Sequence, residues 1–209
     1  SRAITVRHLL THRSGLPMAF LQMPVKPLYE YESLRELADL SGAHGPEFAP
    51  GSRFLYSDAG SDVLGAVVAA VSGVTVEEFI RERILEPLEL RDTFPEAEVD
   101  FADRRDRTAT RYAGMSGSWS RYWGPDDAPI YPFLKGSGGL YSTARDYARF
   151  LRTWMTRNGG EGGALLSAEA FQGALEPASR EVITTGLAGA VMDYGQMWML
   201  PRRREEGAR

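Results

Sequence analysis

The segment Pro50-Gly-Ser-Arg-Phe-Leu-Tyr-Ser-Asp-Ala-Gly-Ser-Asp-Val-Leu-Gly65 joins a tight turn to the most apolar helix that the sequence predicts. Pro50 and Gly51 form a turn dipeptide, and Ser57 or Asp58 can cap a helix N-terminus with a side-chain oxygen. Apolar residues then recur at helical spacing until a glycine ends the pattern: Val63, Leu64, Val67, Val68, Val71 and Gly73. Spacing alone therefore predicts a turn and a capped, buried helix. A tyrosine beside a helix start, such as Tyr56, is common and does not by itself indicate a catalytic role.

The same reasoning predicts further helices on both sides of this segment. Each begins at a Ser or Thr, and in three of them an acidic residue three positions later completes a capping box. These pairs are Ser33 with Glu36, Thr75 with Glu78, and Thr143 with Asp146. We expect helices over residues 5–12, 33–42, 75–86 and 143–159, and a short one starting at Ser167. Strand signals are few, and the clearest covers residues 194–200.

Composition restricts the classes of protein that this chain can belong to. The 209 residues are 43% hydrophobic and 25% charged, which is typical of one medium globular domain or part of a larger one. The net charge is −4, and the short arginine run at 202–204 is followed at once by two glutamates, so nucleic-acid binding is disfavoured. Without cysteine there is no disulfide, thiolate catalysis or cysteine-ligated zinc. The longest apolar stretch, residues 63–71, is too short to span a bilayer.

Two catalytic arrangements can be weighed from spacing. His8 and His12 lie four residues apart, so on a helix both rings would face one side, as a zinc site needs. However, Leu9 stands where the metalloprotease motif has glutamate, and His44 lies beyond a turn, so a structural helix is favoured over a metal site. The sequence also has no Gly-x-Ser-x-Gly, which argues against an α/β-hydrolase triad.

Three stretches resemble, in order, the class C β-lactamase-like family, which includes esterases, penicillin-binding proteins and D-amino-acid peptidases. They are residues 4–17 (Ile-Thr-Val-Arg-His-Leu-Leu-Thr-His-Arg-Ser-Gly-Leu-Pro), the segment from residue 50 continued to Thr93 and Phe94, and residues 136–150 (Gly-Ser-Gly-Gly-Leu-Tyr-Ser-Thr-Ala-Arg-Asp-Tyr-Ala-Arg-Phe). Three matches in the family's order are far more specific than one. The second resembles the family's Tyr-x-Asn region, and the third its glycine-rich turn.

The resemblance implies acyl-enzyme chemistry, in which a serine attacks an ester, β-lactam or D-amino-acid peptide. Tyr56 would then share the role of base with a lysine three residues after the serine, and a tyrosine base needs a nearby cation. Asp58 stands where class C enzymes generally have asparagine, and an ionised aspartate accepts but does not donate hydrogen bonds, so it suits a lysine partner. The implied catalytic residues are Tyr56 and Asp58, with neither a metal nor an organic cofactor.

The family's other catalytic elements are not in this sequence. Neither of its two lysines, Lys26 and Lys135, follows a serine by three positions, so no Ser-x-x-Lys occurs. Lys135-Gly136-Ser137 superficially resembles the family's Lys-Thr-Gly strand, but it lies in the wrong place in the family order, and we interpret Lys135 as a loop residue. The chain opens with Ser1-Arg2-Ala3-Ile4, with neither Met nor an apolar leader, as expected for a fragment.

We therefore expect an α+β, predominantly helical fold: the helical subdomain and excursion loops of the β-lactamase/transpeptidase-like fold, with most of the sheet missing. Residues 1–209 would form one partial domain, with a helical part (1–107), an aromatic loop region (108–139), and a helix with the start of a returning strand (140–209). The aromatic loop, from Trp119 to Phe133, either overhangs the substrate cleft or covers the helical body. The isolated chain would be inactive. The alternative is a non-catalytic peptidoglycan- or peptide-binding relative, and the location (periplasm, exterior or cytoplasm) is left open.

Overall fold

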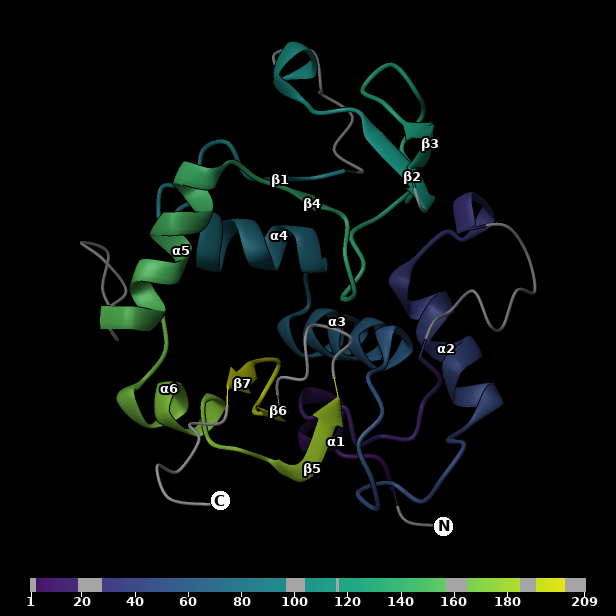
Figure 1. Cartoon of the computed structure of the whole chain (residues 1–209), viewed down its shortest axis with the longest axis vertical. Helices are drawn as coiled ribbons and strands as arrows, with labels where there is room; N and C mark the ends of the chain where they lie inside the picture. Colours follow the sequence, from purple (N-terminus) through teal and green to yellow (C-terminus); the bar gives the residue numbers. More distant parts are fainter. Residues whose placement is uncertain are drawn as a thin grey trace.

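Helix α3 (Asp58–Ser72) is the central element of the chain, and α1 (Val6–Leu10), α2 (Leu34–His44) and α4 (Val76–Ile80) pack against it (Figure 1). The structure, a computed structural model, describes residues 3–18, 28–96, 104–115, 117–156, 165–184 and 191–201. A π-helical turn η3 (Arg81–Leu85) continues α4, and two short 3-10 turns, η2 (Leu28–Glu30) and η4 (Arg105–Arg107), connect other elements. The fold is α+β and mainly helical.

The predicted N-caps are where the sequence places them. The hydroxyls of Thr5, Ser57, Thr75 and Ser167 each accept a backbone N–H from the first turn of their helix. The reciprocal arm of a full capping box is present at Thr75, where Glu78 accepts the Thr75 N–H. These bonds satisfy amide donors that a helix start otherwise leaves without a partner. Local side-chain chemistry therefore fixes where the helices begin.

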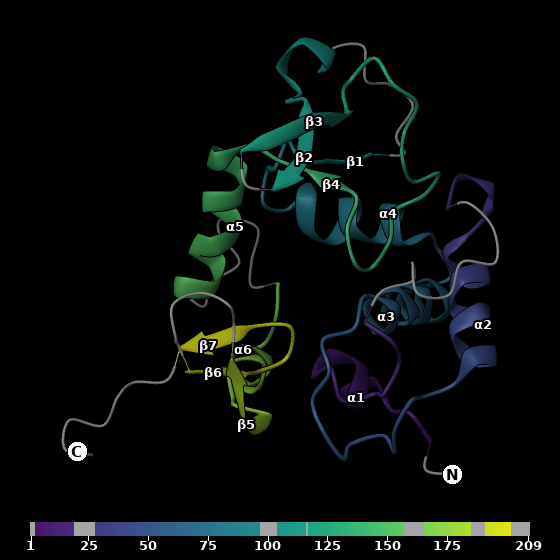
Figure 2. The same ribbon diagram turned by 45° about the vertical axis from the view of Figure 1, so that its right-hand side comes forward.

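Helix α5 (Ala144–Thr156) and α6 (Ala168–Ala174) lie beside the small sheets of the second half of the chain (Figure 2). Strands β1 (Phe94–Pro95) and β4 (Leu140–Tyr141) form one antiparallel pair, and β2 (Arg111–Met115) and β3 (Ser118–Trp123) form a hairpin. Strands β5 (Ser179–Thr184), β6 (Val191–Tyr194) and β7 (Met199–Pro201) form an antiparallel sheet in chain order. The β2–β3 hairpin lies within residues 108–139, where aromatic residues scattered among Gly, Ser and Pro are typical of a long loop or of short irregular strands.

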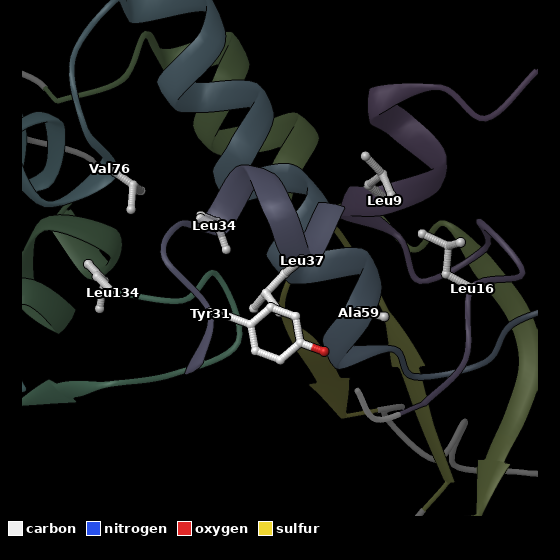
Figure 3. Packing of buried hydrophobic residues seen from close by; sticks show 8 residues of the cluster. All are labelled: Leu9, Leu16, Tyr31, Leu34, Leu37, Ala59, Val76 and Leu134. Atoms are coloured by element: carbon white, nitrogen blue, oxygen red, sulfur yellow. The ribbon is translucent and has the colours of Figure 1, made fainter. Parts of the chain in front are cut away.

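The main core forms where α1, α2 and α3 meet, and Leu134 joins it from a distant loop (Figure 3). Its buried members are Leu9, Leu16, Tyr31, Leu34, Leu37, Ala59, Val76 and Leu134. A second cluster joins the end of η3 to α5 through Leu85, Leu88, Leu90 and Phe150. The burial of these side chains provides the driving force that holds the helices together, at about 25 cal/mol per Å² of apolar surface.

Several sequence-based boundaries are wrong. The first helix ends at Leu10 rather than at residue 12, because His12 adopts a left-handed φ of 50°. The second continues past residue 42 to His44, and Gly45 then caps it by donating its N–H to Ser41 O (3.0 Å). The strand expected over 194–200 is two strands, since the chain turns between β6 and β7 with Met197 at φ 63°. The end expected for the helix at 143–159 lies outside the described residues.

Two further expectations hold only in part. The carboxylates of Glu36 and Asp146 do not return to their own N-caps: Glu36 accepts Glu32 N–H, and Asp146 accepts Asp92 N–H. The most deeply buried residues of α3 are small or polar: Ala59, Gly60, Ser61, Asp62 and Gly65. Of the predicted apolar stripe, Val63, Leu64 and Val68 are partly buried against the main core, whereas Val71 is exposed. Because these small residues let other segments approach the helix backbone closely, α3 can pack against several partners.

Within the described ranges, no single helix is long and apolar enough to cross a membrane. By length and composition, α3 and the stretch Val76–Leu85 reach that threshold only as a pair, and the pair is bent by 82°.

Candidate active site

Tyr56, Ser57 and Asp58 lie at the N-terminus of α3, held by the segment that follows α1. The hydroxyl of Ser57 accepts the N–H of Gly60 and donates to the carbonyl of Pro17, both at 2.8 Å. The N–H of Asp58 donates to Met18 O at 2.6 Å. Hydrogen bonds at the start of α3 thus join residues 4–17 to the segment that starts at residue 50, two of the stretches that resemble the family.

The ring of Tyr56 is accessible, with 42% of the residue exposed. Its inner side lies against the ring of His12, with the two centroids 4.4 Å apart. Burial raises the pKa of the Tyr56 phenol above its ordinary value, and the Asp58 carboxylate raises it further. Tyr56 is therefore a neutral phenol at neutral pH, and it would need a cation beside it to act as a base.

Asp58 and Asp62 lie one helical turn apart on the same face of α3. Lys135 supplies their positive charge: its Nζ is 3.7 Å from Asp62 Oδ2, and the two side chains are only 9% and 1% exposed. Burial raises the pKa of both carboxyls, and the Lys135 ammonium opposes that rise in each. Among the described residues, the site thus contains two partly or fully buried carboxylates and one cation.

The glycine-rich turn that carries Lys135 packs directly on α3. Ser137 N–H donates to Asp62 Oδ1 at 2.9 Å. Gly136 lies so close to the backbone carbonyl of Ser61 that a Cβ at this position would overlap it. Lys135 Nζ also lies 4.6 Å from the centroid of the Tyr131 ring. The turn therefore fixes the ammonium next to the acidic face of the helix.

Lys135 does lie in a loop, as expected, but sequence reasoning missed its charge partner. The available signal was Asp62, an acidic residue inside an apolar helix. A buried carboxylate needs a cation or several hydrogen bonds. The second lysine, Lys26, lies outside the described residues, and no role was expected for it.

The Beta-lactamase family profile matches residues 1–207. This chain belongs to the β-lactamase family. Protein Rv1367c of Mycobacterium tuberculosis is 34% identical over 180 residues, which cover 82% of this chain and 43% of that protein. Monacolin J acid methylbutanoyltransferase of Aspergillus terreus is 30% identical over 219 residues, covering 98% and 51%.

A solved structure has the same arrangement of elements. The penicillin-binding protein from Bacillus halodurans is similar to this β-lactamase-family chain with a TM-score of 0.72 and 27% identity, over 96% of this chain and 57% of that one. The expected β-lactamase/transpeptidase-like fold is therefore confirmed. The chain spans about half the length of these relatives.

The aromatic region of this β-lactamase-family chain is anchored by a buried acid. Glu96 lies 3.0 Å from the Arg111 guanidinium of β2 and accepts the N–H of Ile130 at 2.6 Å. Trp123 is buried at the end of β3, whereas Trp119 and Tyr122 are exposed on the hairpin. This region covers part of the body and also presents aromatic side chains to solvent, so both expectations for it stay open.

The two histidines of this β-lactamase-family chain bond to different segments rather than facing one side of a helix. His8 lies on α1 and accepts Thr5 N–H through Nδ1 at 3.2 Å, whereas His12 lies beyond the helix and accepts Ser57 N–H at 3.1 Å. Among the described residues, no three His, Cys, Asp or Glu side chains are placed to hold a metal ion.

Proposed function

We propose that this chain is the central part of a serine hydrolase that acts through an acyl-enzyme on an ester, a β-lactam or a D-amino-acid peptide. The observation that carries the proposal is the accessible Tyr56 phenol at the N-terminus of α3, next to Asp58, whose pKa burial raises and the Lys135 ammonium lowers. The relatives named as a methylbutanoyltransferase and a penicillin-binding protein support acyl transfer as the shared chemistry.

In this proposal, Tyr56 takes the proton of the nucleophilic serine and later returns it to the leaving group. The lowest-energy state of the isolated site has a neutral phenol, because burial and Asp58 both raise the Tyr56 pKa. A lysine ammonium close to the phenol would lower that pKa, and Asp58 would hold the lysine in place by accepting its N–H. Tyr56 and Asp58 are the two residues that this chain contributes to the reaction.

The nucleophile and its lysine are proposed to lie outside these 209 residues. No Ser-x-x-Lys occurs in them, and the chain spans only about half the length of its relatives. By the same reasoning we propose that most of the sheet, and the family's Lys-Thr-Gly strand, lie outside these residues. Residues 1–107, 108–139 and 140–209 would then be the helical part, the aromatic region and the returning segment of one partial domain, and the isolated chain would be inactive.

The test is covalent labelling of the full-length protein with a fluorophosphonate or penicillin-type probe, followed by peptide mapping. We expect an adduct on a serine that precedes a lysine by three residues. In Tyr56→Phe the labelling rate should fall by about 100-fold or more, since a positioned base typically contributes 10²–10⁴. Tyr29→Phe, at an exposed tyrosine in η2, is the matched control and should label at the unaltered rate.

A second candidate is a non-catalytic relative that binds peptidoglycan or peptide. It is favoured by Asp58, which replaces the family's usual asparagine, and by the raised pKa of Tyr56. A folded full-length protein that takes no label, and that has no Ser-x-x-Lys, would refute the hydrolase and leave this candidate.

A further inference from the structure

His12 bonds to both residues that flank Tyr56. Its backbone carbonyl accepts the N–H of Leu55 at 2.8 Å, and its Nδ1 accepts the N–H of Ser57 at 3.1 Å. Only 1% of the residue is exposed. The left-handed φ of 50° at His12 is unusual for a residue with a side chain, and here it directs the ring towards the start of α3. The backbone on either side of Tyr56 is thus fixed by one histidine.

The imidazole also supports the Tyr56 ring directly. The two rings are tilted by 39° with centroids 4.4 Å apart, which is within the range of favourable aromatic contacts. The imidazole also packs against two other rings: its centroid lies 5.0 Å from that of Tyr194 in β6 and 6.0 Å from that of Phe54, which it meets in an edge-on arrangement. The imidazole is therefore enclosed, and it forms a rigid surface behind the phenol.

The protonation of His12 suits a supporting role rather than proton transfer. Because Nδ1 accepts a hydrogen bond, the proton of the neutral ring is on Nε2, which is buried without a hydrogen-bond partner in the described part of the chain. Burial lowers the pKa of His12 to about 4. The titratable groups that contact the ring are Tyr56 and Tyr194, and both are neutral phenols at neutral pH. His12 therefore adds no charge to the site.

We infer that His12 is the positioning residue for Tyr56: its carbonyl and Nδ1 fix the backbone at Leu55 and Ser57, and its ring fixes the direction of the phenol. The reactive geometry of Tyr56 then depends on His12. This inference rests on the proposed function, in which Tyr56 is the base. A displacement of about 1 Å in a catalytic group typically lowers the rate by about 100-fold, so a positioning residue has a measurable effect without touching substrate.

Two variants separate the functions of the histidine. His12→Asn keeps an acceptor near the place of Nδ1 but removes the ring. His12→Phe keeps a ring but leaves Ser57 N–H buried without an acceptor. Phe54→Leu is the matched control, because it removes an aromatic neighbour of His12 without altering a bond to Leu55 or Ser57. All three are compared with unaltered full-length protein.

The first measurement is the acylation rate with the fluorophosphonate probe as a function of probe concentration. We expect His12→Asn to lower the maximal rate on the order of tenfold or more, with the half-saturating concentration changed less than about twofold. Phe54→Leu should change the maximal rate less than about twofold, even if it lowers the melting temperature as much as His12→Asn does. Equal rate losses in these two variants would overturn the inference, because they would show a general packing effect.

The second measurement does not require activity. In protein labelled with ¹³Cζ-tyrosine, the Tyr56 signal should titrate closer to the ordinary pKa of about 10 in His12→Asn, because water reaches the ring. An unchanged Tyr56 titration in a folded variant would contradict the inference, even in a protein that takes no label. Absence of labelling with a shifted titration would instead refute the proposed function and leave the positioning role.

Discussion

Replacing Lys135 with methionine tests the buried ion pair with Asp62. The two charges are 3.7 Å apart and almost fully enclosed, and within the described residues Lys135 is the cation that lowers the Asp62 pKa. Methionine has a similar length, so the substitution removes the charge with little change in volume. Breaking a buried pair by removing one partner typically costs about 3–5 kcal/mol, because the remaining charge is left without compensation. We expect a loss of this size near pH 8.

The loss should depend on pH in a defined direction. Burial raises the folded-state pKa of Asp62 above its unfolded value, so its ionisation opposes folding as the pH rises through that pKa. Without Lys135 the pKa is higher still. Since a protonated Asp62 needs no counterion, the variant should regain stability relative to the unaltered protein as the pH is lowered from about 8.

The assay is equilibrium urea unfolding followed by the fluorescence of the four tryptophans. Asp39→Asn is the control, because its ion pair with Arg35 is shorter, at 2.8 Å, but exposed, with side chains 63% and 75% accessible. An exposed helical pair of this kind contributes about 0.3–0.5 kcal/mol. The reasoning would be refuted if Lys135→Met cost less than about 1 kcal/mol near pH 8, or if its cost did not shrink at lower pH.

Three further outcomes are expected. Gly136→Ala should strongly destabilise the protein in urea unfolding, because the new methyl group overlaps the backbone carbonyl of Ser61. The control Gly138→Ala places its methyl group in open space and should be nearly neutral. Similar losses of stability in the two variants would contradict the close approach of Gly136 to α3. Leu37→Ala, in the core, should cost about 2–5 kcal/mol by the same measurement, and a loss below about 1 kcal/mol would argue against this packing. Because the pKa of His12 falls from 6.5 to about 4, the protein should lose about 3 kcal/mol of stability as the pH is lowered through that window, and His12→Asn should lose correspondingly less in parallel unfolding curves.

The sequence predicted helix starts better than helix ends. Thr5, Ser57, Thr75 and Ser167 are N-caps as expected, since capping is a contact between residues three positions apart. Helix ends depend on what the chain meets next. The first helix stops early because His12 turns inward to meet Ser57, 45 positions away, and no local pattern encodes that contact.

The family and its fold could be predicted because three stretches match in order, and the family match confirms both. The catalytic roles of Tyr56 and Asp58 stay predictions. The electrostatic environment of the site was not predictable in the same way, because Ser137 and Asp62 are 75 positions apart and are joined only by tertiary packing. The sequence did contain one signal, since Asp62 is an acidic residue within an apolar helical pattern.

The small residues of α3 explain why the site forms at this helix. Large apolar side chains along its inner face would hold neighbouring segments at a distance of a full side chain. Gly60 instead lies against the hydroxyls of Ser14 and Ser57, and Gly65 lies against Gly136 of the turn that carries Lys135. The backbone of α3 is therefore approached closely from two directions, by the segment that contains His12 and by the lysine turn. One segment fixes the direction of Tyr56 and the other supplies the charge beside Asp58, so the geometry and the electrostatics of the candidate site both follow from the same run of small residues.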